Sequence, residues 1–290
     1  MRRTSPASGR FVSLALGRYA SLALGRYASL ALGLVLLGAV LVCAVAPGWV
    51  APYDPLAFDY DALLVSPNWA HPFGTDQFGR DVLSRTIAAS GLDLQIALFA
   101  TIGPLLIGSL AGLLVGYFGG VSDMVFGRLV DLVVTFPFLV LVIAIVAILG
   151  PGLINMYIAI SCVGWVFYAR LMRGEVRIQS QQDYVAAARV LGFRTGRIVF
   201  RHVLPNAVRP VLVYLVTDMA LAILLGSSLG YLGLGAQPPA AEWGVLIADG
   251  KNFFTQAPWI SLFPGAAIVL CGLGFSLTGD GLAELLRVRR

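Results

Sequence analysis

The sequence predicts an all-α integral membrane protein whose helices cross the bilayer six times. Of its 290 residues, 58% are hydrophobic and 12% are charged, whereas soluble domains contain roughly 45 to 50% apolar residues. The 20 basic and 15 acidic side chains cannot cover a soluble surface of this size, which excludes most cytoplasmic enzymes. Charge-free runs recur along the chain, at 27–53, 94–122, 132–169, 219–241 and 252–279.

The lengths of these runs define the spans. A helix needs about 20 apolar residues to cross a bilayer, so four runs supply one span each. The run 132–169 is too long for one crossing, and Gly150-Pro151-Gly152 should divide it into a helical hairpin. The predicted spans are 30–50, 94–116, 127–149, 153–173, 208–230 and 260–282. They form one domain, residues 30–290.

Residues 1–29 form a separate basic segment with an eight-residue repeat that begins at Ser13, Ser21 and Ser29. At about 100° per helical residue, successive copies rotate by roughly 80°, so no continuous face results. We expect a basic helix at the membrane interface. The net charge of +5 accompanies long apolar runs, and it therefore indicates contact with a lipid bilayer rather than nucleic acid.

Basic residues predict the orientation, because positively charged loops stay in the cytoplasm. With six spans both termini lie on one side, and that side holds 17 basic residues against three on the other. The three are Arg80, Arg85 and Lys251. The N- and C-termini are therefore predicted to be cytoplasmic, with outer segments at 53–90 and 236–259 and a long cytoplasmic loop at 174–207.

That cytoplasmic loop predicts a helix-turn-helix under the membrane. Asp183 can cap a first helix, Gly192 can supply the left-handed residue that ends it, and a second short helix then runs to Pro205. Arg194, Arg197 and Arg201 share one face of that second helix. Such a face suits anionic headgroups or the acidic cleft of a docked partner, and the residues alone leave both readings open.

The outer segment contains a polar motif that includes Gly74, Thr75, Asp76, Gly79, Arg80 and Asp81. With His71 these residues could form a hydrolytic or metal site. The pattern fits better a turn and helix cap with a local ion pair. Nothing supplies an activated nucleophile with an oriented base, and three separated cysteines with two histidines offer no metal site. We expect a chain that is not an enzyme and holds no cofactor.

Two groups of glycines lie in the spans. Gly108, Gly112 and Gly116 recur every four residues and let another helix approach closely. Gly230, Gly233 and Gly235 loosen the end of the fifth span, where two readings are equally open: a gate, or a plain helix terminus.

Three aspartates lie near span ends: Asp131, Asp218 and Asp280. They could couple transport to protons. Pairing or solvation at the inner surface is the favoured interpretation, because Arg128 precedes Asp131 and Arg209 precedes the span that holds Asp218.

The cytoplasmic loop resembles a known motif. Ala-Ala-x-x-x-Gly, nine residues and then x-x-Leu-Pro is similar to the EAA loop of ABC importer permeases, which is the coupling helix seated in the ATPase subunit. The residues that match are Ala186, Ala187, Ala188, Gly192, Leu204 and Pro205. Ala186 stands where that family has glutamate, and His202 stands where isoleucine is usual.

A longer series of motifs narrows the resemblance to the C-type permease subunit of dipeptide, oligopeptide and nickel importers. The series begins with His71-Pro-Phe-Gly-Thr-Asp-Gln-Phe-Gly-Arg-Asp-Val-Leu-Ser-Arg85 and continues through Gly116-Tyr-Phe-Gly-Gly120, Leu232-Gly-Leu-Gly235, Trp243-Gly244 and Phe263-Pro264-Gly265. The C-terminal tail differs from the family pattern: Ala283-Glu284-Leu285-Leu286 stands where an Arg-Asp and Asp-Pro signature is usual. The resemblance implies a type I ABC importer permease in a bacterial or archaeal inner membrane.

The resemblance also implies partners. They are a second, B-type permease subunit, two ATPase subunits and an extracytoplasmic substrate-binding protein. ATP and Mg would be bound by the ATPases, because Lys251 is followed by Asn252 and so cannot belong to a phosphate-binding loop. Peptide is the expected substrate, with nickel or another small solute as the alternative. A docking role for Trp243 and Trp259 is a hypothesis from the aromatic and acidic composition of the outer segments.

Two alternative functions belong to other classes of membrane protein. A stand-alone secondary transporter or channel would use the membrane aspartates, whereas the importer needs an ATPase at Gly192. A membrane-embedded hydrolase would use His71.

Overall fold

The computed structural model describes residues 28–286, and the remaining residues lie outside the described part. The predicted N-terminal repeat segment falls almost wholly outside it, as do the last three arginines. Within 28–286 the chain is helical, and Thr75 and Asp81 form an isolated antiparallel bridge. The all-α class predicted from composition is confirmed for these residues.

The helices follow one another along the chain with short connections, apart from the long segments before α3 and before α10. In order they are helix Ala28–Val45, α2 Pro47–Val50, α3 Val82–Phe118, α4 Gly120–Val134, α5 Phe138–Leu149, α6 Leu153–Ser180, α7 Asp183–Val190, α8 Thr195–Ile198, the π-helical turn η1 Val199–Val203, α9 Leu204–Tyr231, α10 Trp243–Gly250, the 3₁₀ turn η2 Lys251–Phe253 and α11 Trp259–Leu285. In the described residues, five helices are long and apolar enough to cross a membrane, and the number is six if the bent pair of α4 and α5 is counted as one broken span.

The broken span corrects the prediction of one continuous helix at 127–149. α4 and α5 meet at an angle of 84°, and Pro137 is the N-cap residue of α5. Proline lacks the amide hydrogen that a continuous helix needs, and it restricts the residue before it. α3 begins at Val82, so the last part of the predicted outer segment 53–90 is helical.

α3 and α6 pack along the predicted glycine face. A Cβ added to Gly108 would lie 2.2 Å from the carbonyl oxygen of Trp165, and one added to Gly112 would lie 2.4 Å from that of Ala169. The two backbones therefore approach more closely than any side chain allows, as small residues in membrane helices permit. The predicted packing role of these glycines is confirmed.

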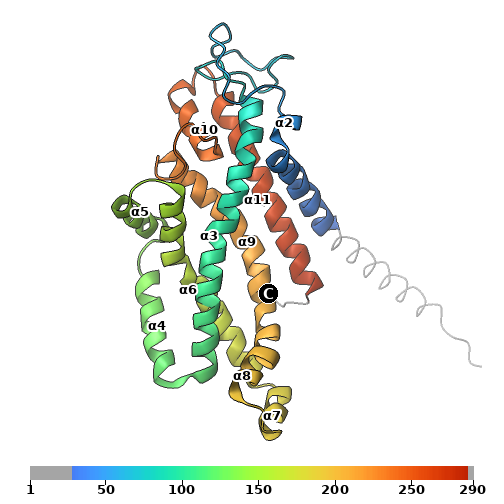
Figure 1. Ribbon diagram of the computed structural model, residues 1–290, viewed down its shortest axis with the longest axis vertical. Coiled ribbons are helices and arrows are strands. Elements are labelled where there is room, and N and C mark those ends of the chain that lie inside the picture. The colour runs from blue at the N-terminus through green and yellow to red at the C-terminus, as the bar shows by residue number, and fades with distance from the viewer. Residues whose placement is uncertain (1–27, 287–290) are drawn as a thin grey trace, which may run out of the picture.

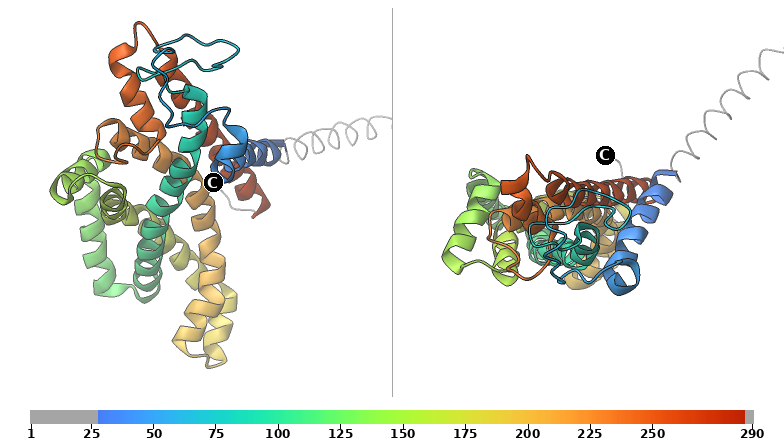
Figure 2. Two further views of the ribbon diagram at one scale, coloured as in Figure 1. Left: turned by 45° about the horizontal axis from the view of Figure 1, so that its top comes forward. Right: turned by 90° about the horizontal axis from the view of Figure 1, so that it is seen from above.

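The molecule is elongated, with α3 near its centre (Figure 1). α4 and α5 lie on one flank and helix Ala28–Val45 on the opposite flank (Figure 2). The segment 51–81 and α10 lie at one end, which we call the α10 end, and α7 and α8 lie at the other, the α7 end (Figure 1). The turn between α5 and α6 belongs to the α10 end, because the Gly152 amide donates to the Leu234 carbonyl (3.1 Å).

Candidate functional site

The α7 end is a helical hairpin closed by a glycine. Gly192 has a φ of +73°, and its amide donates to the Arg189 carbonyl (3.0 Å) while the Phe193 amide donates to that of Ala188 (3.1 Å). These two bonds form a Schellman motif, so the prediction that Gly192 supplies the left-handed residue at the end of the first helix is confirmed. The predicted cap is wrong: Gln182 is the N-cap residue and Asp183 is the first residue of α7, where its charge favours the helix dipole.

The second arm of the hairpin does not end at Pro205. α8 continues through η1 into α9, and the Leu204 amide donates to the Val199 carbonyl in π-helical spacing. Pro205 lies in the first turn of α9, and since it has no amide hydrogen, the wider turn just before it accommodates the missing bond. The hairpin is therefore joined to α9 without a loop.

The hairpin has a buried face and an exposed tip. Val185 and Ala188 of α7 pack against Ile198, Val199 and Val203. Four apolar residues on the opposite side and at the tip are exposed, beside Asp183 and Arg189: Ala186, Ala187, Val190 and Leu191. Val190 is 89% exposed and Leu191 is 70% exposed, and a cluster of large apolar residues in this state usually marks an interaction site.

The three predicted arginines also lie on this hairpin and are exposed. Arg194 is the N-cap residue of α8, and the Arg197 guanidinium lies over the Phe193 ring at 4.3 Å from its centroid. Arg201 follows on η1. The basic face therefore borders the apolar tip.

At the α10 end, the predicted polar motif is an ion-pair network. Asp76 is fully buried and accepts from Arg80 Nε (2.7 Å) and Arg85 Nη1 (2.6 Å). Asp249 of α10 contacts both guanidinium groups, at 3.5 and 3.3 Å. The interpretation as a turn with a local ion pair is confirmed, and the structure adds Arg85 and Asp249 to it.

The remaining members of the motif shape the turn before α3. Gly74 and Gly79 have φ values of +71° and +73°, and Thr75 Oγ1 accepts from the Val65 amide (2.8 Å). Asp81 caps α3 by accepting from the Ser84 amide (2.8 Å) and also contacts His71 Nδ1 (3.0 Å). The side chains of Thr75, Asp76, Arg80 and Asp81 are thus held by internal bonds, whereas Gln77 Oε1 and Arg85 Nε are buried without a partner.

The two tryptophans of the docking hypothesis, Trp243 and Trp259, contact the residues around the start of α3. Trp243 is 1% exposed and donates from Nε1 to the Thr86 carbonyl (2.9 Å). Trp259 is half-buried and donates to the Thr75 carbonyl (3.0 Å). The Trp243 ring lies inside the protein and does not face a partner, whereas the docking role of the outer segments and of Trp259 stays a prediction.

A buried carboxyl pair that the sequence did not reveal holds α10 in place. Asp93 of α3 and Glu242 are both 0% exposed and hydrogen-bonded to each other. Asp93 accepts from the Trp243 amide (3.1 Å), and Glu242 accepts from the Gly244 and Val245 amides (2.8 and 3.0 Å). Burial raises the pKa of Glu242, because it disfavours the charged carboxylate. No spacing rule connects residues so far apart in sequence.

The glycines at the end of α9 form a helix terminus. Gly233 has a φ of +75°, and the Leu234 amide donates to the Leu229 carbonyl (2.8 Å). Gly230 packs against Glu242, and Gly235 lies against Gly230. Of the two open readings, the plain terminus accounts for this geometry, and a gate role stays a prediction.

The partners of two membrane aspartates differ from those predicted. Asp131 pairs with Arg170 (2.9 Å) rather than Arg128. Asp218 accepts from the Tyr168 hydroxyl (2.7 Å) rather than pairing with Arg209. The cause is the same for both, since α6 packs beside these helices and its side chains are nearer than those along the same helix.

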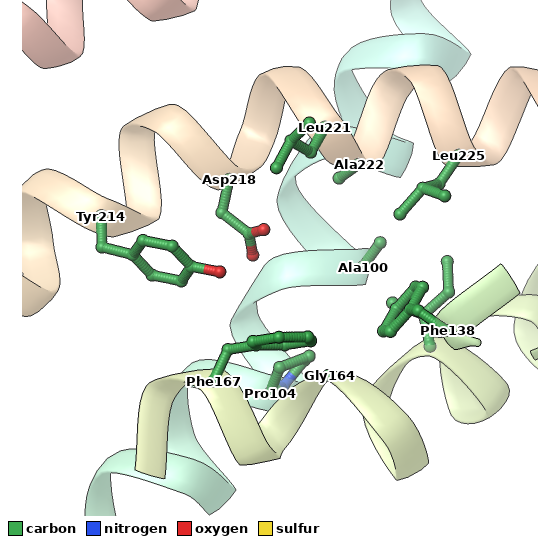
Figure 3. A pocket seen from close by; sticks show the side chains of 11 residues that line it. Ala100, Pro104, Phe138, Gly164, Phe167, Tyr214, Asp218, Leu221, Ala222 and Leu225 are labelled. Carbon is green, nitrogen blue, oxygen red and sulfur yellow. The ribbon is translucent and has the colours of Figure 1, made fainter. Parts of the chain in front are cut away.

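Asp218 lies at a cavity of about 190 Å³ between α3, α5, α6 and α9 (Figure 3). The lining residues are Ala100, Pro104, Phe138, Ile160, Gly164, Phe167, Tyr214, Asp218, Leu221, Ala222 and Leu225. Asp218 is the one charged residue among them.

Comparison with known proteins agrees with this arrangement. Residues 108–290 match the family described as binding-protein-dependent transport system inner membrane component. The chain belongs to this family of inner-membrane permeases.

Similar relatives carry related names. The chain is 43% identical over 223 residues to a dipeptide transport system permease protein of Alkalihalophilus pseudofirmus, with 77% of the chain and 73% of the relative covered. It is 40% identical over 252 residues to a probable D,D-dipeptide transport system permease protein of Escherichia coli, covering 87% and 85%. It is 42% identical over 259 residues to a di/tripeptide transport system permease protein of Pseudomonas aeruginosa, covering 87% and 86%.

These findings confirm the resemblance to ABC importer permeases of the C-type. The permease is a membrane component of a binding-protein-dependent transport system, and such a system has partner subunits. The family match includes α6, the hairpin, α9 and α11.

Proposed function

We propose that this permease forms half of the translocation pathway of an ATP-driven peptide importer. The names of the relatives, which refer to dipeptides, D,D-dipeptides and di/tripeptides, support a short peptide as substrate. Nickel or another small solute is the alternative within the resemblance. In this proposal the α7 end faces the cytoplasm, as the distribution of basic residues predicts.

The observation that carries the proposal is the exposed apolar tip of the hairpin. Val190 and Leu191 are exposed beside Gly192, and burial of an apolar side chain of this size contributes about 1.5–3 kcal/mol. An ATPase subunit supplies the groove that would bury them. Because the hairpin is continuous with α9, a movement of the ATPase reaches the membrane through one helix.

The proposed assembly contains a second permease subunit, two ATPases that bind ATP and Mg, and an extracytoplasmic binding protein. This permease would carry out no chemistry. The matching loop residues Ala186, Ala187 and Gly192 lie at the exposed side of the hairpin, where an ATPase can reach them.

The test places a charge at the tip. Val190→Asp and Leu191→Asp should each abolish co-purification of the ATPase and peptide uptake, because a carboxylate cannot enter an apolar groove without a large desolvation cost. Gln181→Asp is the matched control, since Gln181 is exposed at the start of the hairpin and outside the tip. Membrane insertion should be normal in all three.

Each outcome has a meaning for the proposal. Normal ATPase binding in both tip variants would refute docking at the hairpin. Uptake by the purified chain alone, without ATPase, would instead support a stand-alone transporter that uses the membrane aspartates.

A further inference from the structure

The cavity in Figure 3 combines apolar walls with one carboxyl group. α3 contributes Ala100 and Pro104, and aromatic rings come from Phe138 of α5 and Phe167 of α6. On the α9 side, the Asp218 carboxylate points into the space, and Tyr214 lies next to it (Figure 3). Sites for whole small ligands usually occupy about 300–1,000 Å³, so a cavity of about 190 Å³ fits one end of a peptide.

Asp218 has a hydroxyl partner but no cationic partner among the ion pairs of the described residues. Tyr168 donates to Oδ2 (2.7 Å), and the other lining residues from α3, α5 and α6 are apolar. A carboxylate can accept about four hydrogen bonds. Asp131 is different, because it has the Arg170 guanidinium at 2.9 Å.

The position of Asp218 matters as much as its chemistry. It lies midway along α9, between the terminal residues Leu204 and Tyr231, and not near a span end as predicted. α9 belongs to a candidate membrane span. An unpaired carboxylate within a span is costly, and such residues mark substrate or ion pathways.

The chemistry that suits this cavity is a primary ammonium group on a small apolar body. The carboxylate offers a charge-assisted hydrogen bond, and the neighbouring aromatic rings favour a cation over their faces. Every peptide with a free N-terminus carries such a group. We propose that Asp218 binds the terminal ammonium group of a peptide as the peptide passes through this cavity.

This inference rests on the proposed peptide import, and a labelling experiment on the assembled complex tests it directly. Cys43, Cys162 and Cys271 are replaced by serine, and Leu225→Cys places a thiol in the cavity wall. Dialanine at millimolar concentration should slow maleimide labelling of this thiol at least threefold, whereas N-acetyl-dialanine should not. Asp218→Asn should remove the protection. Equal protection by the two probes, or protection that persists in Asp218→Asn, would overturn the assignment.

Measurements of peptide uptake distinguish a binding role of Asp218 from a structural one. In reconstituted complexes with saturating binding protein, Asp218→Asn should lower the initial rate of dialanine uptake about tenfold or more, since a hydrogen bond to a charged group contributes about 1.5–3 kcal/mol. ATPase activity should stay within twofold. Tyr168→Phe is the matched control, because it removes the same hydrogen bond from the other side but keeps the carboxylate, and it should retain most uptake.

The remaining outcomes are distinguishable. An equal loss in Tyr168→Phe and Asp218→Asn would show that the contact between α6 and α9 is what matters, and would refute the inference. Wild-type uptake that stops with a protonophore at constant ATP would indicate proton transfer by Asp218 instead. Absence of dialanine uptake by an ATPase-active wild-type complex would refute peptide import itself, and the inference with it.

Discussion

Gly230 and Glu242 are so close that a Cβ on Gly230 would lie 2.0 Å from Glu242 Oε2. The end of α9 and the start of α10 therefore fit together only because residue 230 has no side chain. Glu242 cannot move away easily, because two backbone amides of α10 donate to its carboxyl group.

Gly230→Ala should lower the stability of the permease. Alanine is the better helix former by about 1 kcal/mol, so a loss of stability would have to come from the clash, which we expect to cost about 1–3 kcal/mol. Thermal unfolding of the purified complex measures it. Gly272→Ala, on the open side of α11, is the control and should be neutral or stabilising. The same result for both variants would contradict the contact.

The buried carboxyl pair should make stability depend on pH. Burial raises the pKa of Glu242 from its ordinary value of 4.5, so the native state binds more protons than the unfolded state. Its contribution is therefore complete below pH 4.5 and is lost as the pH rises through the raised pKa. The melting temperature of Glu242→Gln, followed from acid to alkaline pH, should fall less steeply than that of the wild type. Parallel profiles would contradict the raised pKa of Glu242.

Asp76 and Asp249 should differ strongly in their effect on stability. Asp76→Asn leaves two buried guanidinium groups without their nearest carboxylate, and breaking a buried ion pair costs about 3–5 kcal/mol. Asp249 is 30% exposed and lies farther from both arginines, so Asp249→Asn should cost about 1 kcal/mol or less. Chemical unfolding of the two variants gives the comparison. A similar loss in both would mean that the charge, and not its burial, is what matters.

Gly112→Ala should separate α3 from α6. The new Cβ would meet the Ala169 carbonyl at 2.4 Å, and a backbone atom inside a helix cannot turn aside as a side chain can. We expect a cost of about 1–3 kcal/mol and weaker recovery from the membrane. Gly174→Ala, with open space around it on α6, should be unaffected. Equal recovery of both variants would argue against close packing.

Local patterns in the sequence predicted local features correctly. The four-residue spacing of Gly108, Gly112 and Gly116 gave a helix-packing face, and the position of Gly192 gave the end of α7. The pairing of Asp76 with Arg80 also followed from spacing along one turn.

Features that depend on distant residues could not be predicted in this way. Asp93 and Glu242 meet only because α10 folds back onto α3, and Asp249 reaches Arg85 for the same reason. The exposed apolar face of the hairpin depends on which side of α7 packs inward. Pro137 lies inside the predicted span 127–149, but the bend of 84° at this position was not predicted, because the residues around it form one long apolar run.

Because no loop separates the hairpin from α9, a movement of the hairpin passes to α9 through continuous helix. From Thr195 to Asp218 the chain is helical throughout, and at 1.5 Å per residue this is about 35 Å. A tilt at the hairpin therefore has a continuous helical path to the cavity, along which η1 and Pro210 are the positions where the helix bends most easily. Under the proposed function, the conformational change of the ATPase and the release of the peptide from the cavity would be directly coupled.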